Sequence, residues 1–403
     1  MLTAGLVFAL SVFGAMPAPQ VQHEHHMGAP PSGCDDTSPR CASAATPAFA
    51  SDGALMLAWG AQGRLWVARS KDLGVNWASP VAVNPEPVTL DAGADSRPQI
   101  LVNPDARIVV AYAVIKDERY NGQVLTATSD DGGLSFSRPR PITGDMSSQR
   151  FVCMALDRVG RIFAAWIDKR NSVAAKNAGK SFAGASLAFS WSSDAGSTFG
   201  AAGIVQDNIC ECCRIGVAMA APNRPVLIFR NIFGGERDHG VVTFDNGLTP
   251  GAVLRVSEDH WKIEACPHHG PSISVTADGT YHAVWFCGGG VRQGTFYARS
   301  RDEGRTFSAP LPIGAKERHP TRPDIYALAR TVWATWKEFD GSKTAVMVMV
   351  SQDSGATWSA PHQMAETADY SDHPLLVSDG RRVYLSWLTR IEGYRLFPLE
   401  AQP

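Results

Sequence analysis

The sequence predicts an all-β fold built from repeated four-stranded units, and three observations predict it. A phrase of the form Ser-x-Asp-x-Gly-x-x-aromatic occurs five times along the 403 residues. Aromatic residues close an apolar strand pattern at a regular period. Gly and Pro are frequent, with 37 and 26 copies, which is typical of many short strands joined by turns. Together these patterns predict a β-propeller of about seven four-stranded blades.

The repeated phrase has the chemistry of a hairpin turn. Its Asp can accept hydrogen bonds from the amides of its own turn, and its Gly supplies a positive φ. The aromatic residue then starts the next strand and packs inward. We therefore expect a structural role for the five aspartates Asp72, Asp131, Asp194, Asp302 and Asp353.

An aromatic residue ends the second strand of each expected unit. These residues are Trp59, Tyr112, Trp166, Phe229, Trp285, Trp336 and Trp387, and subtraction gives steps of 53, 54, 63, 56, 51 and 51 residues. This period is that of a propeller blade and gives seven units. The fourth unit has no recognisable turn phrase, and the seventh has only three apparent strands. We expect an N-terminal strand to close the ring by joining the last blade, and no helix; a six-bladed ring is the alternative.

Composition and the N-terminus bear on the cellular location. The formal net charge is −2, so nothing points to nucleic acid or to anionic lipid. An apolar run followed by small residues predicts a signal peptide over residues 1–20, and the run is too short for a membrane anchor. Residues 21–45 then form a linker and 46–400 the propeller. We expect a monomeric protein that is periplasmic or secreted, with no membrane span after cleavage.

The linker carries two further features. Cys34 and Cys41 lie in a polar stretch, and in an oxidising compartment they predict a local disulfide. A tract with His23, His25, His26 and Met27 is typical of weak copper or nickel capture, so we treat it as a possible accessory metal site. An incidental polar linker is the alternative.

The loops that connect one blade to the next should lie on one face, beside the central axis, and they contain Arg, His and Cys. The segments Cys210-Glu-Cys212-Cys213-Arg and Cys266-Pro-His268-His269 belong to neighbouring blades. Thiolates and imidazoles that converge there could bind copper or zinc. The alternative is a disulfide from Cys266 to one of the other three cysteines. Outside these loops, the sequence context of Cys153 and Cys287 indicates buried free thiols or a mutual bridge.

Two sets of residues carry a family resemblance. The repeated phrase resembles the Asp box, or bacterial neuraminidase repeat, of the sialidase-like propellers. Five other phrases, at 210–214, 266–271, 336–341, 371–376 and 392–396, are similar to a group of exported bacterial Asp-box proteins. The resemblance covers nearly the whole chain and implies the propeller architecture. It does not establish glycosidase chemistry, because function has to be argued from the site.

The resemblance also implies candidate catalytic residues. Sialidases hold a carboxylate with three arginines and use a Tyr/Glu nucleophile pair with an Asp acid. The candidates here are Arg97, Arg150, Arg214 and Arg322, with Tyr394 and Glu392 as the pair and Tyr120 as a second tyrosine. Asp95, Asp168 and Asp238 are the candidate acids.

Three functions follow as hypotheses. The first is binding of a copper-type metal or a small anionic ligand at a Cys/His/Arg site on the axial face. The alternative is an exo-acting glycoside hydrolase for sialic-acid-like sugars, which requires converging arginines and the Tyr/Glu pair. A protein-interaction platform is the third, and it requires an exposed apolar or charged patch.

Overall fold

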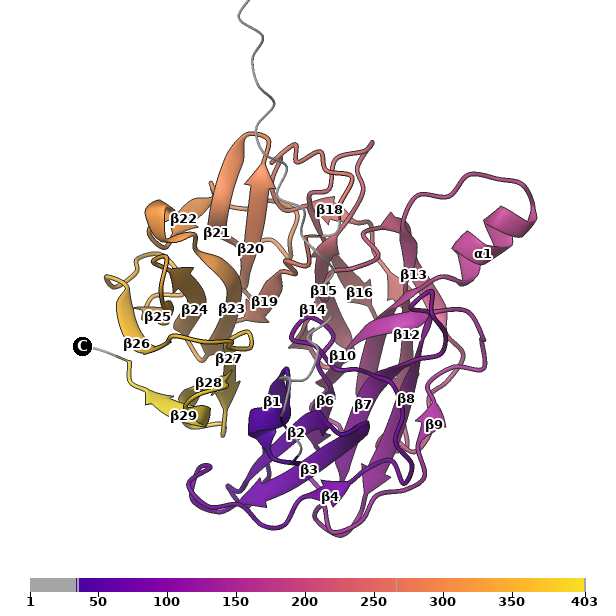
Figure 1. Cartoon of the computed structure of the whole chain (residues 1–403). Coiled ribbons are helices and arrows are strands. Elements are labelled where there is room, and N and C mark those ends of the chain that lie inside the picture. The colour runs from indigo at the N-terminus through magenta and orange to yellow at the C-terminus, as the bar shows by residue number, and fades with distance from the viewer. Residues whose placement is uncertain (1–33, 35, 266, 402–403) are drawn as a thin grey trace, which may run out of the picture.

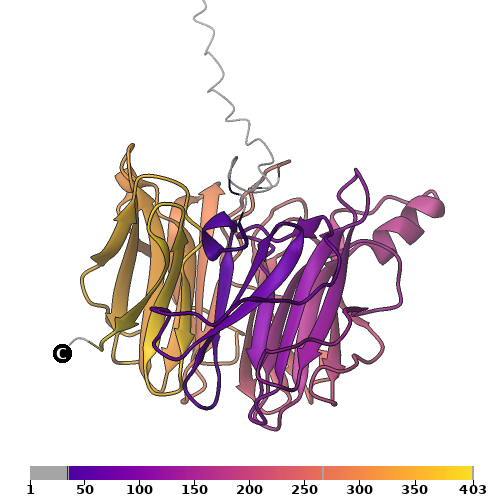
Figure 2. The same ribbon diagram turned by 60° about the horizontal axis from the view of Figure 1, so that its bottom comes forward.

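The computed structural model describes residues 34, 36–265 and 267–401. In this part of the chain the strands form seven antiparallel sheets arranged around a ring (Figure 1). The strands run between the two faces of the ring (Figure 2). The predicted seven-bladed propeller is confirmed, and the six-bladed alternative is excluded. The predicted signal peptide and the tract with His23, His25, His26 and Met27 lie outside the described residues.

The first four blades follow the chain in order. Blade 1 contains β1 (Ala45–Phe49), β2 (Leu55–Ala61), β3 (Arg64–Ser70) and β4 (Val81–Ala82). Blade 2 contains β5 (Leu90–Asp91), β6 (Gln99–Val102), β7 (Ile108–Ile115), β8 (Gly122–Ser129) and β9 (Arg140–Pro141). Blade 3 contains β10 (Gln149–Leu156), β11 (Ile162–Asp168), β12 (Ala185–Ser192) and β13 (Gly203–Ile209). Blade 4 contains β14 (Gly216–Ala221), β15 (Arg224–Arg230), β16 (His239–Asp245), β17 (Thr249–Pro250) and β18 (Leu254–Arg255).

The last three blades complete the ring. Blade 5 contains β19 (Ser272–Val275), β20 (Tyr281–Gly289), β21 (Arg292–Ser300) and β22 (Leu311–Ile313). Blade 6 contains β23 (Thr321–Leu328), β24 (Thr331–Phe339), β25 (Thr344–Ser351) and β26 (His362–Thr367). Blade 7 has three strands, β27 (Leu375–Ser378), β28 (Val383–Thr389) and β29 (Gly393–Leu399).

The periodic aromatic residues are the anchors of the blades. All seven lie in the second long strand of their blade and are at most 2% exposed. The five tryptophans among them each donate the indole N–H to an oxygen, on Thr37, Asp168, Asp259, Glu338 and Asp372. Each tryptophan anchor therefore combines a large apolar surface with a satisfied polar group, which is the condition for burying tryptophan.

The repeated turn phrases share one hydrogen-bond pattern. In all five, the Ser hydroxyl donates to the Asp carboxylate at 2.7–2.8 Å. The Gly amide donates to the Ser hydroxyl at 2.8–2.9 Å. The amide four residues after the Asp donates to its carboxylate at 2.8–2.9 Å. The turn is thus held by its own side chains, and the Asp carboxylate is its centre.

The glycines of two phrases also contact the preceding blade closely. Gly196 of blade 3 has φ +86°, and a Cβ there would lie 2.6 Å from both methyl groups of Val109 in blade 2. A Cβ on Gly355 of blade 6 would lie 1.8 Å from the hydroxyl of Tyr297 in blade 5. A side chain at either position would push the two blades apart, so the phrase both turns the chain and joins neighbouring blades.

The expectation that the chain has no helix is wrong. A helix, α1 (Arg170–Asn177), connects β11 to β12 at the rim of the ring (Figure 1). It buries no residue, so its sequence lacks the apolar stripe by which a helix is recognised. Two short 3₁₀ turns, η1 (Pro39–Cys41) and η2 (Lys316–Arg318), also occur. No helix in the described part of the chain is both long and apolar enough to cross a membrane.

The expected N-terminal strand that closes the ring is not found among the described residues. Among the described strands none pairs with the outer edge of β29, because β1 is the innermost strand of blade 1. Blades 1 and 7 are joined instead by side chains: the Ala45 amide donates to Asp372, and the Tyr370 hydroxyl donates to the Ser43 carbonyl. The predicted disulfide between Cys34 and Cys41 is confirmed. Cys34 and Cys41 both lie in the apolar cluster that includes Leu388 of β28.

Candidate axial site and thiol cluster

Four of the loops that connect the blades meet across the ring. Arg322, in β23, donates from Nη1 to both carboxylate oxygens of Asp95 at 3.0 Å, although 227 residues separate them. His373, which precedes β27, lies with Nδ1 3.9 Å from Asp95 Oδ1 and 3.4 Å from Arg214 Nη1. Blades 2, 4, 6 and 7 therefore contribute to one group, as expected for loops beside the central axis. We call Asp95, Arg97, Arg214, Arg322, Lys337, Asp372 and His373 the axial cluster.

Arg97 has a structural place within this cluster. Its Nη1 donates to the carbonyl of Ala45 and its Nη2 to the carbonyl of His373, both at 3.0 Å. The guanidinium also lies 3.7 Å from Asp372, and both side chains are almost fully buried. Arg97 thus connects blade 2 to blades 1 and 7, at the point where the ring closes.

Two further members are positioned by backbone carbonyls. Arg214 donates from Nε to Pro271 at 3.4 Å and from Nη2 to Pro323. Lys337 Nζ donates to the carbonyls of Ser371 at 3.0 Å and Asp372 at 3.3 Å. These bonds keep the cationic groups in fixed positions near the axis, as a preformed anion site requires.

Burial and charge shift several protonation equilibria in the axial cluster. Burial lowers the pKa of Lys337 to about 8, with the charge of Arg322 adding to the effect. Burial raises the pKa of Asp372 to about 6, against the opposing charge of Arg97. Burial and then the charges of Arg322 and Arg214 lower the pKa of His373 well below its usual value. His373 is therefore neutral at pH 7.

The cluster carries an excess of positive charge. Four cationic side chains (Arg97, Arg214, Arg322 and Lys337) stand near three carboxyls, Asp95, Asp324 and Asp372. Four minus three leaves one positive charge when all are ionised. Both hydrogen bonds of Arg322 to Asp95 use Nη1, and the Arg322 side chain is 20% exposed. Neither Nε nor Nη2 of Arg322 has a hydrogen-bond partner among the described residues.

Other predicted catalytic residues have their side-chain partners outside this cluster. Arg150 forms a bidentate ion pair with Asp91, at 2.6 and 3.1 Å. The Tyr394 hydroxyl bonds to Ser386, and its ring packs against Trp77 between blades 7 and 1. Glu392 pairs with Arg395 at 3.7 Å. Within the described residues, the arginines of the axial cluster pair with other groups than Tyr394 and Glu392.

The other candidate acids and the second tyrosine have local roles. Asp168 accepts bonds from Trp166 and Arg170, and Asp238 accepts the amides of Asp259, His260 and Trp261. Tyr120 is 55% exposed. The sequence patterns did not single out Lys337, Asp372 or His373 as site residues, although the phrases at 336–341 and 371–376 contain all three.

A second group, the thiol cluster, lies between β13 and β14 and consists of Cys210, Cys212 and Cys213. The Cys210 sulfur is 3.5 Å from that of Cys212 and 3.7 Å from that of Cys213, and all three sulfurs lie within 4.8 Å of one another. These separations exceed the ~2.05 Å of an S–S bond. The three side chains are at most 5% exposed.

Two arginines donate to the thiol cluster. Arg230 Nη1 lies 3.3 Å from the Cys213 sulfur, and Arg237 Nη1 lies 3.4 Å from the Cys210 sulfur. Hydrogen bonds from Cys212 and Cys213, with the charges of both arginines, hold the pKa of Cys210 well below its usual value. The hydrogen bond to Cys210 raises the pKa of Cys213. The cluster thus favours one thiolate even before any ligand binds.

The other predicted ligands do not join these sulfurs. His269 bonds through Nδ1 to the Thr321 hydroxyl at 2.8 Å and stacks on Phe286 at 4.0 Å, and the His268 ring lies 6.3 Å from that of Phe151. Neither imidazole is within the 4.8 Å grouping of described ligand atoms. Cys266 lies outside the described residues, so its bond or ligation stays a prediction. Cys153 and Cys287 are buried and unbridged.

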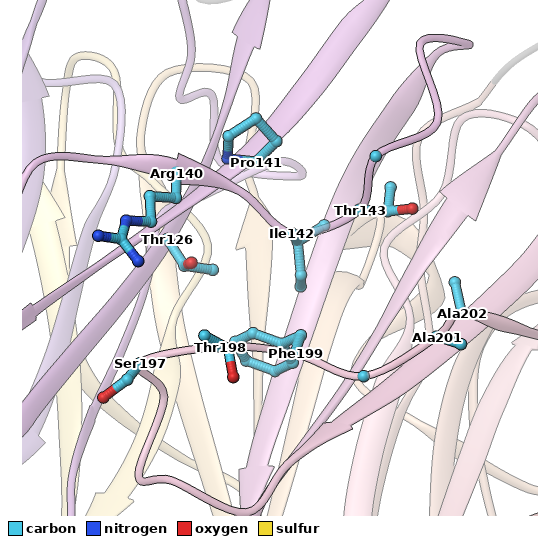
Figure 3. A pocket seen from close by; sticks show the side chains of 12 residues that line it. Thr126, Arg140, Pro141, Ile142, Thr143, Ser197, Thr198, Phe199, Ala201 and Ala202 are labelled. Carbon is cyan, nitrogen blue, oxygen red and sulfur yellow. The ribbon is translucent and has the colours of Figure 1, made fainter.

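A pocket of about 390 Å³ opens elsewhere, between blades 2 and 3 (Figure 3). The segment Arg140–Gly144 forms one wall and Ser197–Ala202 the other, and Ile142 and Phe199 face each other across it. Among the described residues that line the pocket, Arg140 is the one with a charged side chain, and none is an acid, a histidine or a cysteine. These lining residues provide no group for acid–base catalysis or for metal binding.

Comparison with known proteins gives the fold. No family model matches the chain, and no curated protein matches it in sequence. A protein of unknown function from Dyadobacter fermentans DSM 18053 is similar in structure, with a TM-score of 0.54 and 15% identity over 78% of this chain and 94% of that one. A Hadza microbial sialidase, Hz136, gives 0.51 and 16% over 89% of this chain and 65% of that one.

A third similar structure is an ulvan lyase of polysaccharide lyase family PL25, bound to -[GlcA(1-4)Rha3S]-. It gives a TM-score of 0.54 and 10% identity over 87% of this chain and 92% of that one. At such low identity these likenesses show the fold alone: the chain is a sialidase-like seven-bladed β-propeller.

Proposed function

We propose that the protein is a carbohydrate-active enzyme that cleaves a glycosidic bond next to an anionic group of its sugar. One observation carries the proposal, the convergence of Arg214, Arg322 and Lys337 with Asp95 on the axis of the ring. Arginine pairs with carboxylates in a bidentate way, and Asp95 leaves two nitrogens of Arg322, Nε and Nη2, unused. The similar structures support the class, because they include a sialidase and a polysaccharide lyase.

Asp95 has the proton-transfer role in this proposal. In the absence of a ligand its carboxylate is the partner of Arg322. A sugar carboxylate that binds Arg322 competes with Asp95 for the guanidinium. Released from this ion pair and placed beside a second carboxylate, Asp95 would take up a proton from water and pass it to the glycosidic oxygen. The Tyr394 hydroxyl accepts a hydrogen bond from Ser386 and its ring packs between blades 7 and 1, so the proposal assigns it no part as a nucleophile.

The decisive experiment measures cleavage with a panel of anionic sugars. Purified full-length protein is incubated with sialosides and with uronate-containing oligosaccharides, and products are identified by mass spectrometry. Hydrolysis adds water across the bond. Elimination instead gives an unsaturated product that is lighter by one water than the product that hydrolysis of the same bond would release. Absence of both turnover and measurable binding across the panel refutes the proposal.

Substitution of Arg322 tests the role of the axial cluster. We expect Arg322→Ala to lower kcat/KM by roughly 10- to 100-fold, since a hydrogen bond to a charged group contributes about 1.5–3 kcal/mol. Arg322→Lys should retain part of the activity, because it keeps the charge without the bidentate fork. Arg381→Ala, on the exposed surface of blade 7, is the matched control and should be unaffected.

The same proposal includes a location outside the cytoplasm. The predicted signal peptide and the Cys34–Cys41 disulfide support it, since disulfides persist in oxidising compartments. Fractionation of cells that express the full chain checks this point. Recovery of the processed protein in the cytoplasm would contradict it.

A further inference from the structure

We propose that the thiol cluster of Cys210, Cys212 and Cys213 binds one Cu(I) ion through three sulfur ligands. This site is separate from the axial cluster and does not depend on the proposed enzymatic function. The inference rests on sulfur geometry, on the charge that surrounds the sulfurs and on buried polar groups without partners.

The geometry of the sulfurs fits a three-coordinate metal. With a metal–sulfur distance of about 2.3 Å, a trigonal site has its sulfurs about 4.0 Å apart. The sulfur of Cys210 lies 3.5 and 3.7 Å from the other two, and the third separation is within 4.8 Å. The three sulfurs come from one short loop whose ends are held by strands β13 and β14. The ligands are therefore close to the required arrangement without a change of fold.

Charge selects a monovalent ion. Three thiolates carry −3, and the two guanidiniums of Arg230 and Arg237 that donate to them carry +2. One Cu(I) makes the sum zero, whereas Zn(II) leaves an uncompensated charge in an almost fully buried place. Thiolates are soft ligands that suit Cu(I) as well as zinc, so the charge balance is what favours Cu(I) here.

Partnerless polar groups lie beside the cluster. His239 is 2% exposed, and neither of its ring nitrogens has a hydrogen-bond partner among the described residues. His239 is close enough to Cys210 that the negative charge of the Cys210 thiolate acts to raise the pKa of His239. The Nε of Arg230 is buried and, in the described part of the chain, without a partner too. Buried polar groups without a partner are rare in folded proteins, and an ion that is absent from the structure is one explanation for them.

Arg230 is held in place by more than the thiol. Its Nη2 donates to the His269 carbonyl at 2.9 Å, and its guanidinium lies 4.4 Å from the centre of the Trp261 ring. A cation fixed in this way, 1% exposed, needs a counter-charge. Metal-bound thiolates would provide it permanently, because a coordinated thiol is deprotonated.

The test is a Cu(I) titration of the reduced full-length protein under nitrogen, in competition with the coloured Cu(I) complex of bicinchoninate. We expect one equivalent of Cu(I) to be withdrawn from the complex, with X-ray absorption showing three sulfur neighbours at about 2.3 Å. The triple variant Cys210→Ser/Cys212→Ser/Cys213→Ser should withdraw none. The matched control Cys153→Ser/Cys287→Ser removes two buried thiols outside the cluster and should behave as the wild type.

Two further variants keep the three sulfurs intact and so guard against a folding defect. Arg237→Gln should weaken Cu(I) binding at least tenfold, because it removes one of two compensating charges. His239→Phe should retain the full equivalent, since three sulfurs complete the site. Circular dichroism and thermal unfolding establish that each variant is folded.

Four results would overturn the proposal. The wild type could withdraw no more Cu(I) than the triple variant. Alkylation and mass spectrometry could find a disulfide within residues 210–213 that resists reduction. Zn(II) could displace Cu(I) at equal concentration, which would contradict the charge argument. His239→Phe could abolish binding, which would contradict a site completed by three sulfurs. None of these results affects the Arg322 assay, so the two proposals fail independently.

Discussion

At the residue scale, the aspartates of the turn phrases are the most uniform feature of the chain. Asp302 shows why: the Thr306 hydroxyl and amide and the Ser300 hydroxyl all donate to one carboxylate. These bonds, led by that of the Thr306 hydroxyl, lower the pKa of Asp302 to about 2. The carboxylate therefore accepts bonds in the folded state that its protonated form cannot keep.

This pKa shift predicts an acid-sensitive contribution to stability. Because the folded pKa is below the unfolded value of about 3.9, the contribution is fully present above about pH 4 and is lost as the pH falls toward 2. We expect Asp302→Asn to lower the melting temperature at pH 6, and the gap to the wild type to narrow by pH 3. Thermal unfolding between pH 6 and 2.5 measures it, and a gap that does not change with pH would contradict the prediction.

A second variant isolates the cause of the shift. Thr306→Val removes the largest donor to Asp302 and leaves the carboxylate in place. The Asp302 pKa should rise toward its usual value, so the pH window of acid destabilisation should narrow as well. Carboxyl titration by NMR would measure the shift directly.

At the element scale, the turn phrases act on their neighbours as much as on their own blade. Gly196 combines a positive φ with contact between blades 3 and 2. Gly160 has nearly the same φ, +84°, but a Cβ at that position would have no atom within 4 Å. Substitutions at these two glycines therefore distinguish the cost of backbone strain from the cost of steric contact between blades.

The comparison of these two glycines gives a quantitative prediction. Gly160→Ala should cost about 1 kcal/mol in the free energy of unfolding from backbone strain alone. Gly196→Ala should cost a further ~1–3 kcal/mol, because its methyl group overpacks against Val109. Urea unfolding of both variants measures the difference. Adding Val109→Ala should recover part of the extra cost in Gly196→Ala; equal costs for the two glycines would refute the inter-blade role.

At the scale of the whole molecule, the ring is closed by a few buried polar side chains and by packing. Arg97 binds carbonyls from blades 1 and 7 and faces Asp372, and the Ala45 amide donates to the same Asp372 carboxylate. The residues that join the first and last blades thus include members of the axial cluster. A change there should affect both the closure of the ring and the arrangement of the site.

Removal of Arg97 should destabilise the whole ring. We expect Arg97→Ala to cost about 3–5 kcal/mol, because it leaves Asp372 buried without its cation. The pKa of Asp372, already raised to about 6, should rise further in the variant. An acid whose folded pKa is raised loses stability as the pH increases through that pKa, so the deficit should be larger at pH 8 than at pH 5.

Urea unfolding of Arg97→Ala at both pH values checks this prediction. The double variant Arg97→Ala/Asp372→Asn is the control, since it has no carboxyl left to titrate at this position. Its free energy of unfolding should lack the pH dependence that Asp372 contributes, so it should change less between pH 5 and pH 8 than that of Arg97→Ala. If the single variant shows no such pH dependence either, the pair does not contribute to closure as described.

The sequence by itself determined the blades. Their number follows from the spacing of the seven anchors from Trp59 to Trp387, and the turns follow from Ser, Asp and Gly residues that bond within a few positions of one another. These interactions are local or repeat at the period of a blade, so they can be read along the chain. The disulfide of Cys34 and Cys41, seven residues apart, belongs to the same class.

Only the tertiary structure decided the composition of the sites. Asp95 and Arg322 meet because the ring brings blades 2 and 6 together, and no spacing in the sequence encodes a contact over 227 residues. In the same way, Tyr394 packs between two blades with its hydroxyl bonded to Ser386, while Arg230 and Arg237 are the partners of the thiols. The choice among residues of suitable chemistry depends on which loops converge, and convergence is a property of the closed ring.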